Sequence, residues 1–505
     1  MEKTQLNQGM VIKDTAIYMI AKCIEAVMGV VTMSAMTYLF ASEQMGMYST
    51  VNIAITTIGL VAIQWLAQAT LRFANKYDVQ GKIEDFFSTV FHSWLKTNII
   101  AVSVSAVVVC LIKLGLENVS WFGMFSLKNS VSIIVVGTLW FITYNTSQLV
   151  ISMVAAMRKS TLNLLLSIVT VFGKLTFIVI FCWTWGSRIE WIFLSYFLTD
   201  GIVAMIGIMQ LKLYQYISIE KKSKCILLEL KEYGTPLMGN MLTTSVLNKS
   251  DIYIVTFFLG ASAAGIYQTN YSLVATAFTM LSSAVMRGSY PTVLRVWSEG
   301  KKELSTRLIS NAARLYLLLA IPATVGIWML SDVIATSLYA PEYFEGHDIM
   351  GWVALAMMFL GLTEYNIKPW ELNAKSKCIL RRSLIGGMLN VALNLVLVPF
   401  IGYKVAAVTT FAGYFAYCIL ARYGTRQYEQ WSLPLKVYLR IIGSALGMAL
   451  VLYFLKSILP PNVMGLVLMV LIGILVYGII LTITGEVKEE LKVILKRINF
   501  IRRQE

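Results

Sequence analysis

The chain has 505 residues, of which 57% are hydrophobic and only 14% are charged. Soluble domains carry about a quarter charged residues, so this composition excludes a soluble multidomain fold. The formal net charge of +15 is interpreted as basic cytoplasmic loops of a membrane protein rather than as a nucleic-acid interface. The six cysteines are scattered without metal-ligand spacing, so neither disulfides nor a metal site is expected.

About fourteen apolar stretches are long enough to span a membrane as helices of roughly 20 residues. In chain order, the predicted helices cover residues 14–40, 47–72, 88–112, 130–156, 161–184, 190–211, 236–259, 264–287, 312–338, 349–371, 379–400, 403–421, 438–457 and 463–484. The first is too long for a cleavable signal and is predicted to remain as a signal-anchor helix. These runs are continuous rather than alternating, which excludes a closed β-barrel.

Positive charges concentrate in every second loop. Basic residues crowd the loops around 212–231, 287–314, 368–382 and 422–440 and the tail at 488–503. The intervening loops contain only Lys113, Lys128, Arg188, Lys404 and Lys456. This alternation predicts an even number of spans with both termini in the cytoplasm.

An internal repeat relates two parts of the chain. Residues 37–41 and 46–50 align with residues 256–260 and 265–269, in each case 219 positions later. Six spans separate the copies, which predicts a parallel repeat about an axis along the membrane normal.

These observations predict an all-α polytopic membrane protein of about fourteen transmembrane helices. Two six-helix lobes are followed by two C-terminal helices: an N-lobe at 1–220, a C-lobe at 221–430, and residues 431–505 with the last two helices and a basic amphipathic tail. The basic stretch 212–232 is predicted to join the lobes as an interfacial amphipathic segment, and the tail to lie on the inner leaflet.

No phosphate-binding loop or catalytic constellation is present, and the two histidines form no motif. We therefore predict a protein that is not an enzyme and carries no resident cofactor. The candidate functional residues are instead ionisable groups inside predicted helices, which cost free energy in lipid. They are Lys22, Glu25, Lys174, Asp200, Lys249, Asp251 and Glu364.

Two predicted helices also carry polar stripes. The seventh has Asn240, Thr244, Asn248 and Asp251 on one face, and the second has Thr57, Gln64, Gln68 and Arg72. The 219-residue offset relates Gln68 to Arg287. Matched stripes in both lobes predict a shared, water-filled cleft. Alternatives remain open: Arg72 and Arg287 can snorkel to headgroups, Lys22 and Glu25 can form a structural pair, and Asn and Thr can join helices.

Short motifs resemble a known family. They are Lys13-Asp14-Thr15-Ala16-Ile17-Tyr18, the turn Gly46 to Ser49, Leu71-Arg72-Phe73, and Asn248 to Ile254 followed by Leu259-Gly260 and Ala264 to Tyr267. The sequence resembles the polysaccharide-transporter family of lipid-linked oligosaccharide flippases (Wzx type), within the multidrug/oligosaccharidyl-lipid/polysaccharide exporter superfamily. The resemblance covers the first twelve predicted helices.

The resemblance implies two lobes around a cationic cavity that works by alternating access, driven by an H⁺ or Na⁺ gradient. It implies undecaprenyl-pyrophosphate-linked oligosaccharide as substrate, for O-antigen, capsule or exopolysaccharide, in the bacterial cytoplasmic membrane. A polysaccharide polymerase and a chain-length regulator are the implied protein partners, besides membrane lipids. Family cavities favour arginine, whereas this chain has lysines with acids close by, which leaves the sign of the cavity open.

The predicted site residues fall into two sets. The predicted substrate-binding set is Lys22, Gln68, Arg72, Lys174, Asn240, Asn248, Lys249 and Arg287. The predicted ion-coupling set is Glu25, Asp200, Asp251 and Glu364. Two other functions remain open, a cation-coupled multidrug antiporter of the same superfamily and a lipid II-type peptidoglycan-precursor flippase. A membrane-embedded glycan polymerase is disfavoured because the outer loops are short.

Overall fold

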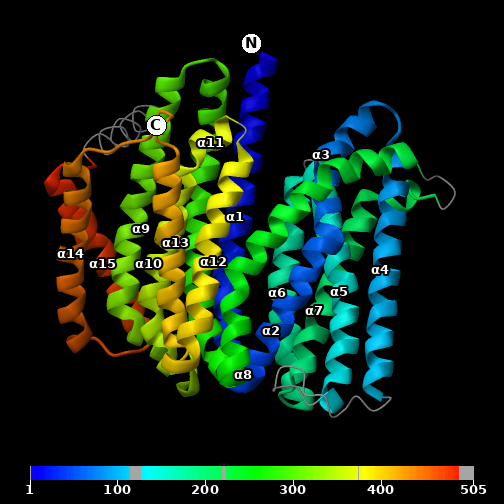
Figure 1. The fold of residues 1–505 in the computed structure, drawn as a ribbon, viewed down its shortest axis with the longest axis horizontal. Helices are drawn as coiled ribbons and strands as arrows, with labels where there is room; N and C mark the ends of the chain where they lie inside the picture. Colours follow the sequence, from blue (N-terminus) through cyan, green and yellow to red (C-terminus); the bar gives the residue numbers. More distant parts are fainter. Residues whose placement is uncertain (1, 114–126, 158, 219–222, 374, 488–505) are drawn as a thin grey trace, which may run out of the picture. The chain divides into compact units, whose positions relative to one another are not determined.

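The computed structural model describes residues 2–113, 127–157, 159–218, 223–373 and 375–487 (Figure 1). Within these ranges the chain is helical, with short turns and no strand. It divides into two compact units, 1–268 and 269–505. This division falls inside a helix. The lobe boundaries predicted at 220 and 430 stay predictions.

The helices of the first unit follow the predicted order. They are α1 (Glu2–Leu39), α2 (Ser42–Gly59), the π-helical turn η1 (Leu60–Gln64), α3 (Trp65–Val79), α4 (Ile83–Lys113), α5 (Leu127–Ala156), α6 (Ser160–Trp185), α7 (Ile189–Leu211), the 3₁₀ turn η4 (Leu213–Gln215) and most of α8 (Lys224–Ser298). α2, η1 and α3 follow one another without a break and form the second predicted span.

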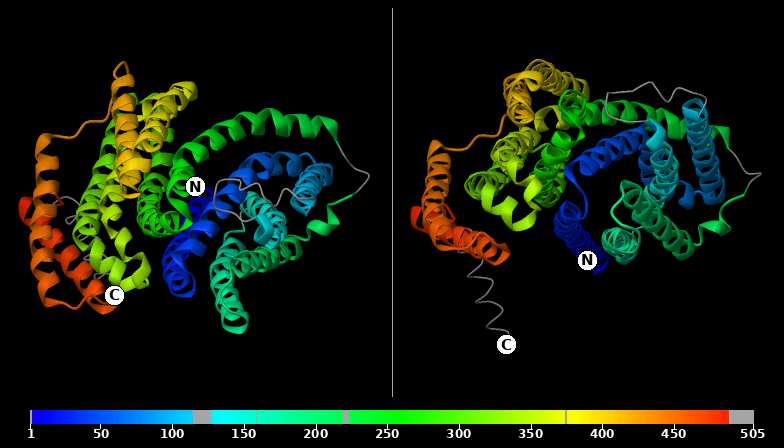
Figure 2. Two further views of the ribbon diagram at one scale, coloured as in Figure 1. Left: turned by 60° about the horizontal axis from the view of Figure 1, so that its bottom comes forward. Right: turned by 90° about the horizontal axis from the view of Figure 1, so that it is seen from below.

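The second unit begins within α8. It continues with α9 (Lys302–Leu338), the 3₁₀ turn η5 (Pro341–His347), α10 (Asp348–Asn366), α11 (Lys368–Leu372), α12 (Ser376–Ile401), α13 (Lys404–Gly424), α14 (Leu435–Ile458) and α15 (Val463–Thr484). Figure 2 shows α14 and α15 running beside each other.

Thirteen helices in the described ranges are long and apolar enough to cross a membrane. The count is one below the predicted fourteen because α8 contains two predicted spans. Gly260 interrupts α8 with a φ of 91° and a ψ of 171°, a conformation that glycine adopts without steric penalty. The kink separates the stretches predicted at 236–259 and 264–287, so each of these two predicted spans lies on its own part of α8.

The start of α8 packs on other helices of the first unit. Ile226 and Leu230 are buried in a cluster that also contains Leu66 of α3 and Phe87 of α4. Hydrogen bonds from Lys76 and Tyr77 hold the pKa of the Glu229 carboxyl below its usual value. The stretch predicted to be interfacial therefore places part of its apolar face against protein.

Charged contacts connect the last two helices to α9. Glu486, just beyond α15, has a side chain only 3% exposed, and its carboxylate lies 2.7 Å from Arg314 Nε and 3.2 Å from Arg440 Nη1. Towards the other end, Lys456 Nζ of α14 lies 2.8 Å from Asp332 Oδ1 of α9. These residues were not singled out by the sequence, because their partners are more than 40 positions away.

Replacing Glu486 by glutamine is expected to destabilise the protein by about 3–5 kcal/mol, because two arginines lose a buried counter-charge. Thermal unfolding of the purified protein measures the loss. The matched control is Asp332→Asn, because the Lys456–Asp332 pair is more exposed. This substitution is expected to cost at most about 1 kcal/mol of stability. Equal melting temperatures for the two variants would contradict the assigned role of Glu486.

Candidate functional site

A lysine and a carboxylate meet inside the helices of the first unit. Lys174 Nζ on α6 lies 3.3 Å from Asp200 Oδ1 on α7. The Asp200 side chain is 3% exposed and that of Lys174 is 20% exposed. The indole Nε1 of Trp140 on α5 donates to Asp200 Oδ2 over 2.9 Å. The pair therefore joins three helices, and only its lysine end remains accessible.

Aromatic side chains enclose this pair. Lys174 Nζ lies 4.5 Å from the centre of the Tyr196 ring, which favours a cation on that face. The Tyr196 hydroxyl forms a 2.8 Å hydrogen bond with the Tyr48 hydroxyl of α2. Trp140 and Phe193 pack against each other in the same group, with ring centroids 5.6 Å apart and planes tilted by 31°. The rings limit water around the ion pair, which strengthens electrostatic interactions there.

Lys22 and Glu25 form a second, more exposed pair on α1. Their charged atoms are 2.5 Å apart, and Ser167 of α6 donates to the other Glu25 oxygen over 2.7 Å. Ser167 and Lys174 are seven residues apart on α6, a spacing that returns to the same helix face. Both ion pairs thus contact the same face of α6, one through Ser167 and the other through Lys174. The sequence analysis assigned the lysine and the acid of each pair to different roles.

The second and seventh predicted spans pack along each other in antiparallel directions. From one end to the other, Ser42 Oγ lies 2.6 Å from Ser262 Oγ, Thr50 Oγ1 lies 3.2 Å from Thr256 Oγ1, and Thr57 Oγ1 lies 3.5 Å from Ser245 Oγ. At the far end, a Cβ on Gly234 would lie 2.6 Å from the Trp65 ring. We call this row of small and hydroxyl side chains the α2–α8 seam. It joins the two helices that were predicted to carry matched polar stripes.

Two repeat-equivalent glycines form the closest contact of this seam. A Cβ on Gly46 would lie 1.7 Å from the Ala261 carbonyl oxygen, and one on Gly265 would lie 2.0 Å from the Ser42 carbonyl oxygen. Gly46 and Gly265 are 219 positions apart, as are Ser42 and Ala261. The contact is therefore symmetric under the sequence repeat, and only residues without a side chain permit it.

The other predicted residues of the first unit are dispersed. Asp251 is buried and accepts a 3.1 Å hydrogen bond from the Tyr267 hydroxyl. The Arg72 guanidinium lies 4.4 Å over the Tyr233 ring. Gln68 and Lys249 are partly buried. Asn240 and Asn248 lie on α8 in the first unit and Arg287 lies on α8 in the second unit, but the side chains of these three residues are outside the described residues.

Glu364 lies in the second unit, beside a group that sequence reasoning missed. Lys368 Nζ is 3.9 Å from Glu364 and 2.5 Å from Glu371, and it lies 4.1 Å over the Tyr290 ring. The Tyr290 hydroxyl donates to Glu371 over 2.5 Å. The helical spacings of Glu364 and Glu371 from Lys368, four and three residues, were signals in the sequence, whereas Tyr290 is contributed by a distant helix.

A buried amide network between α12 and α13 was also missed. Asn394 Nδ2 donates to Asn390 Oδ1 over 2.8 Å, Asn390 Nδ2 donates to Thr410 over 3.1 Å, and Thr409 donates to Asn394 over 2.5 Å. Each donor satisfies a neighbouring acceptor, which is how polar side chains join helices inside a membrane.

Comparison with known proteins decides the family. The family model described as polysaccharide biosynthesis protein matches residues 11–297, more than half of the chain. The chain belongs to this family. It is 29% identical over 247 residues to a probable low-salt glycan biosynthesis flippase of Haloferax volcanii, and 24% identical over 316 residues to the probable flippase AglR of the same organism.

These matches cover 47% and 61% of this chain, and 51% and 65% of the respective relatives. The chain thus aligns with between half and two thirds of the length of these relatives. Among solved structures, it is similar to the lipid II flippase MurJ in an inward closed conformation. The TM-score is 0.74 at 14% identity, over 94% of this chain and 99% of that one.

This similarity confirms the predicted fold class. The protein is an all-α, multi-pass membrane protein with two six-helix lobes and two C-terminal helices. The resemblance to the polysaccharide-transporter family noted in the sequence is likewise confirmed. The assigned roles of the individual site residues stay predictions.

Proposed function

We propose that the chain is a flippase that carries a lipid-linked oligosaccharide across a bilayer by alternating access. The observation that carries the proposal is the Lys174–Asp200 pair inside the spanning helices of a polysaccharide-biosynthesis family member. Charged groups at such positions are costly, so function is their default explanation. The separation of 3.3 Å exceeds the usual 2.7–2.9 Å of a charge-assisted hydrogen bond. This loose contact leaves Lys174 able to exchange partners.

In the proposed cycle, the diphosphate of the substrate replaces Asp200 as the partner of Lys174. A diphosphate is a dense anion, and an ammonium in a weakly hydrated site attracts it strongly. Asp200 keeps its hydrogen bond from Trp140 and takes up a proton or an alkali cation, which removes the negative charge that would otherwise repel the diphosphate. The polyprenyl chain remains in lipid. Departure of the head group returns Asp200 to Lys174 and releases the coupling ion.

Finer assignments rest on the sequence resemblance. We propose undecaprenyl pyrophosphate as the carrier and O-antigen, capsule or exopolysaccharide as the product. We also propose a bacterial cytoplasmic membrane with both termini inside, and a polymerase and a chain-length regulator as partners. The basic inner loops support this orientation.

The test is flipping by the purified protein in liposomes. An undecaprenyl-pyrophosphate-linked oligosaccharide with a fluorophore on its sugar is added, and a membrane-impermeant reductant quenches the fluorophores on the outer leaflet. We expect protein-dependent exchange between leaflets that accelerates with an imposed H⁺ or Na⁺ gradient. Gradient-driven ethidium transport without flipping would contradict the proposal and favour the multidrug antiporter.

A further inference from the structure

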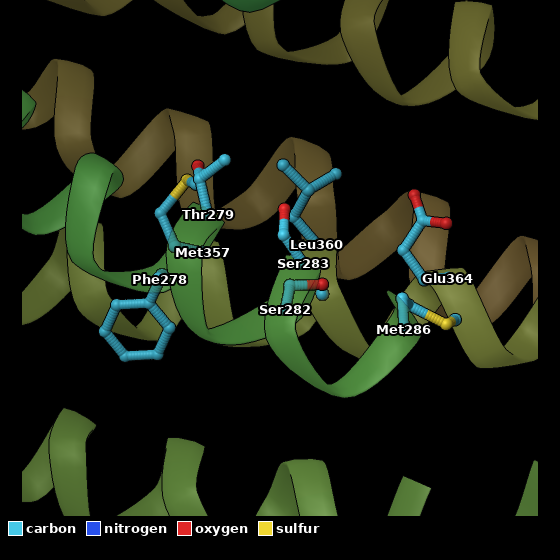
Figure 3. A pocket seen from close by; sticks show the side chains of 9 residues that line it. Phe278, Thr279, Ser282, Ser283, Met286, Met357, Leu360 and Glu364 are labelled. Carbon is cyan, nitrogen blue, oxygen red and sulfur yellow. The ribbon is translucent and has the colours of Figure 1, made fainter. Parts of the chain in front are cut away.

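One pocket of the second unit lies within membrane-spanning segments. It has a volume of about 270 Å³ and lies between α8 and α10 (Figure 3). Its α8 side is formed by residues 278, 279, 282, 283 and 286, and its α10 side by residues 357, 360, 361 and 364. Both sets have the spacing of one helix face, and the α8 set spans about 12 Å at 1.5 Å per residue.

The pocket combines polar and apolar walls. Figure 3 shows Phe278 towards one end and Glu364 towards the other, with Ser282 and Ser283 between them. Met357 and Leu360 of α10 add an apolar side. The carboxylate accepts hydrogen bonds only, whereas the serine hydroxyls both donate and accept. A ligand that fits must therefore carry several hydroxyl or amide groups and also an apolar face.

The charge at the Glu364 end is negative. Three ionisable groups gather there, and Lys368 is held closer to Glu371, at 2.5 Å, than to Glu364, at 3.9 Å. Glu371 accepts a further hydrogen bond from Tyr290. The single positive charge is therefore largely matched by Glu371, and the Glu364 carboxylate remains the acceptor that faces the pocket.

We infer that this pocket binds a neutral or amino sugar of the transported glycan, an inference that rests on the proposed function. Sugar hydroxyls donate to Glu364 and exchange hydrogen bonds with Ser282 and Ser283, while the C–H face of the ring packs on Phe278. An engineered cavity of about 150 Å³ already holds benzene, so the volume accommodates a pyranose ring with its substituents.

Other ligand chemistries fit this pocket less well. A hard cation takes about six to eight oxygens at close to 2.5 Å, whereas much of this wall is thioether, aliphatic and aromatic. A phosphate is repelled by Glu364, because Lys368 already has a closer carboxylate. A cationic amphiphile shares the attraction to Glu364 but leaves the serine hydroxyls without ligand partners. A sugar forms hydrogen bonds with the polar wall and packs its C–H face on the apolar wall.

The experiment measures binding by calorimetry to the full chain in nanodiscs. The lipid probes are farnesyl diphosphate alone, the same lipid carrying N-acetylglucosamine, and the same lipid carrying glucuronic acid. Tetraphenylphosphonium is the cationic probe. The variants are Glu364→Gln and the double variant Ser282→Ala/Ser283→Ala. Ser289→Ala is the matched control, because its hydroxyl donates to the Val285 carbonyl over 2.8 Å and does not line the pocket.

The wild-type protein is expected to prefer the N-acetylglucosamine lipid over both other probes. Glu364→Gln should weaken that binding about tenfold to a hundredfold through loss of a charged hydrogen-bond acceptor. It should also remove the discrimination against glucuronic acid, because the repelling charge is gone. Binding of unglycosylated farnesyl diphosphate should stay unchanged. Ser289→Ala should behave as wild type.

Four results would overturn the inference. If the wild type binds glycosylated and unglycosylated lipids with equal affinity, the sugar site is rejected. The same holds if both pocket variants keep the wild-type preference for the N-acetylglucosamine lipid. Either result leaves the flippase proposal standing. Loss of tetraphenylphosphonium binding in Glu364→Gln, with lipid binding intact, assigns the pocket to cationic drugs. Failure of the wild type to bind any of the three lipids contradicts the proposed function itself.

Discussion

Replacing Lys174 by methionine is expected to abolish flipping and to destabilise the protein by about 3–5 kcal/mol. The substitution leaves the Asp200 carboxylate, 3% exposed, without its cation, and breaking a buried pair from one side costs about that much. Proteoliposome flipping and thermal unfolding measure the two effects. Lys456→Met is the control, because its partner Asp332 is far more exposed, and it should retain both flipping and most of the stability.

The double variant Lys174→Met/Asp200→Asn separates a structural role from a functional one. Both charges are removed together, and the amide oxygen that replaces the carboxylate can still accept from Trp140. Stability should therefore return to within about 1 kcal/mol of wild type, since an uncharged pair often replaces a buried ion pair without loss. Flipping should remain absent because neither a phosphate partner nor an ion-coupling carboxylate is left. Wild-type flipping by this variant would show that the pair is only structural.

Replacing Gly265 or Gly46 by valine is expected to open the α2–α8 seam and to abolish transport. The new Cβ atoms would lie 2.0 Å from the Ser42 oxygen and 1.7 Å from the Ala261 oxygen, so the backbones must separate. Because the two helices can no longer approach, fewer molecules adopt the conformation in which α2 and α8 are in contact. The readout is a disulfide between Ser42→Cys and Ser262→Cys, whose native hydroxyl oxygens are 2.6 Å apart, in a variant lacking the native cysteines.

Cross-linking should be rapid with native glycines and slower by at least about tenfold with either valine, which corresponds to about 1.4 kcal/mol or more against the closed seam. If the disulfide blocks transport, reduction of the disulfide should restore transport. Gly29→Val on α1 is the matched control, because nothing lies within 4 Å of its Cβ position. Equal cross-linking rates in Gly265→Val and Gly29→Val would show that the glycine contact does not hold the seam.

The positions of the helices were predictable because membrane insertion is a local property. A run of about 20 apolar residues must satisfy its backbone within itself, so a helix follows from the run alone. Even the pair within α8 was located correctly, and the structure added only that Gly260 joins them by a kink. The repeat was also readable, since Gly46 and Gly265 occupy equivalent positions in two similar motifs.

The partners of the site residues were not predictable in the same way. Intramembrane charges at Lys174 and Asp200 stood out as costly, yet nothing in their spacing of 26 residues showed that they form one pair. Sequence reasoning placed them in different sets, one for substrate and one for ion coupling. The pairing depends on how α6 rotates against α7, and packing against Trp140 and Tyr196 sets that rotation.

Composition, apolar runs and loop charges alone identified a polytopic helical protein and located its spans, because lipid imposes the same demand on every segment independently. Contacts between helices decided the rest. The symmetric approach of Gly46 and Gly265, the burial of Glu486 between two arginines and the pocket at Glu364 each require atoms from distant spans. Such contacts are set by small differences in packing between helices, which no single apolar stretch encodes.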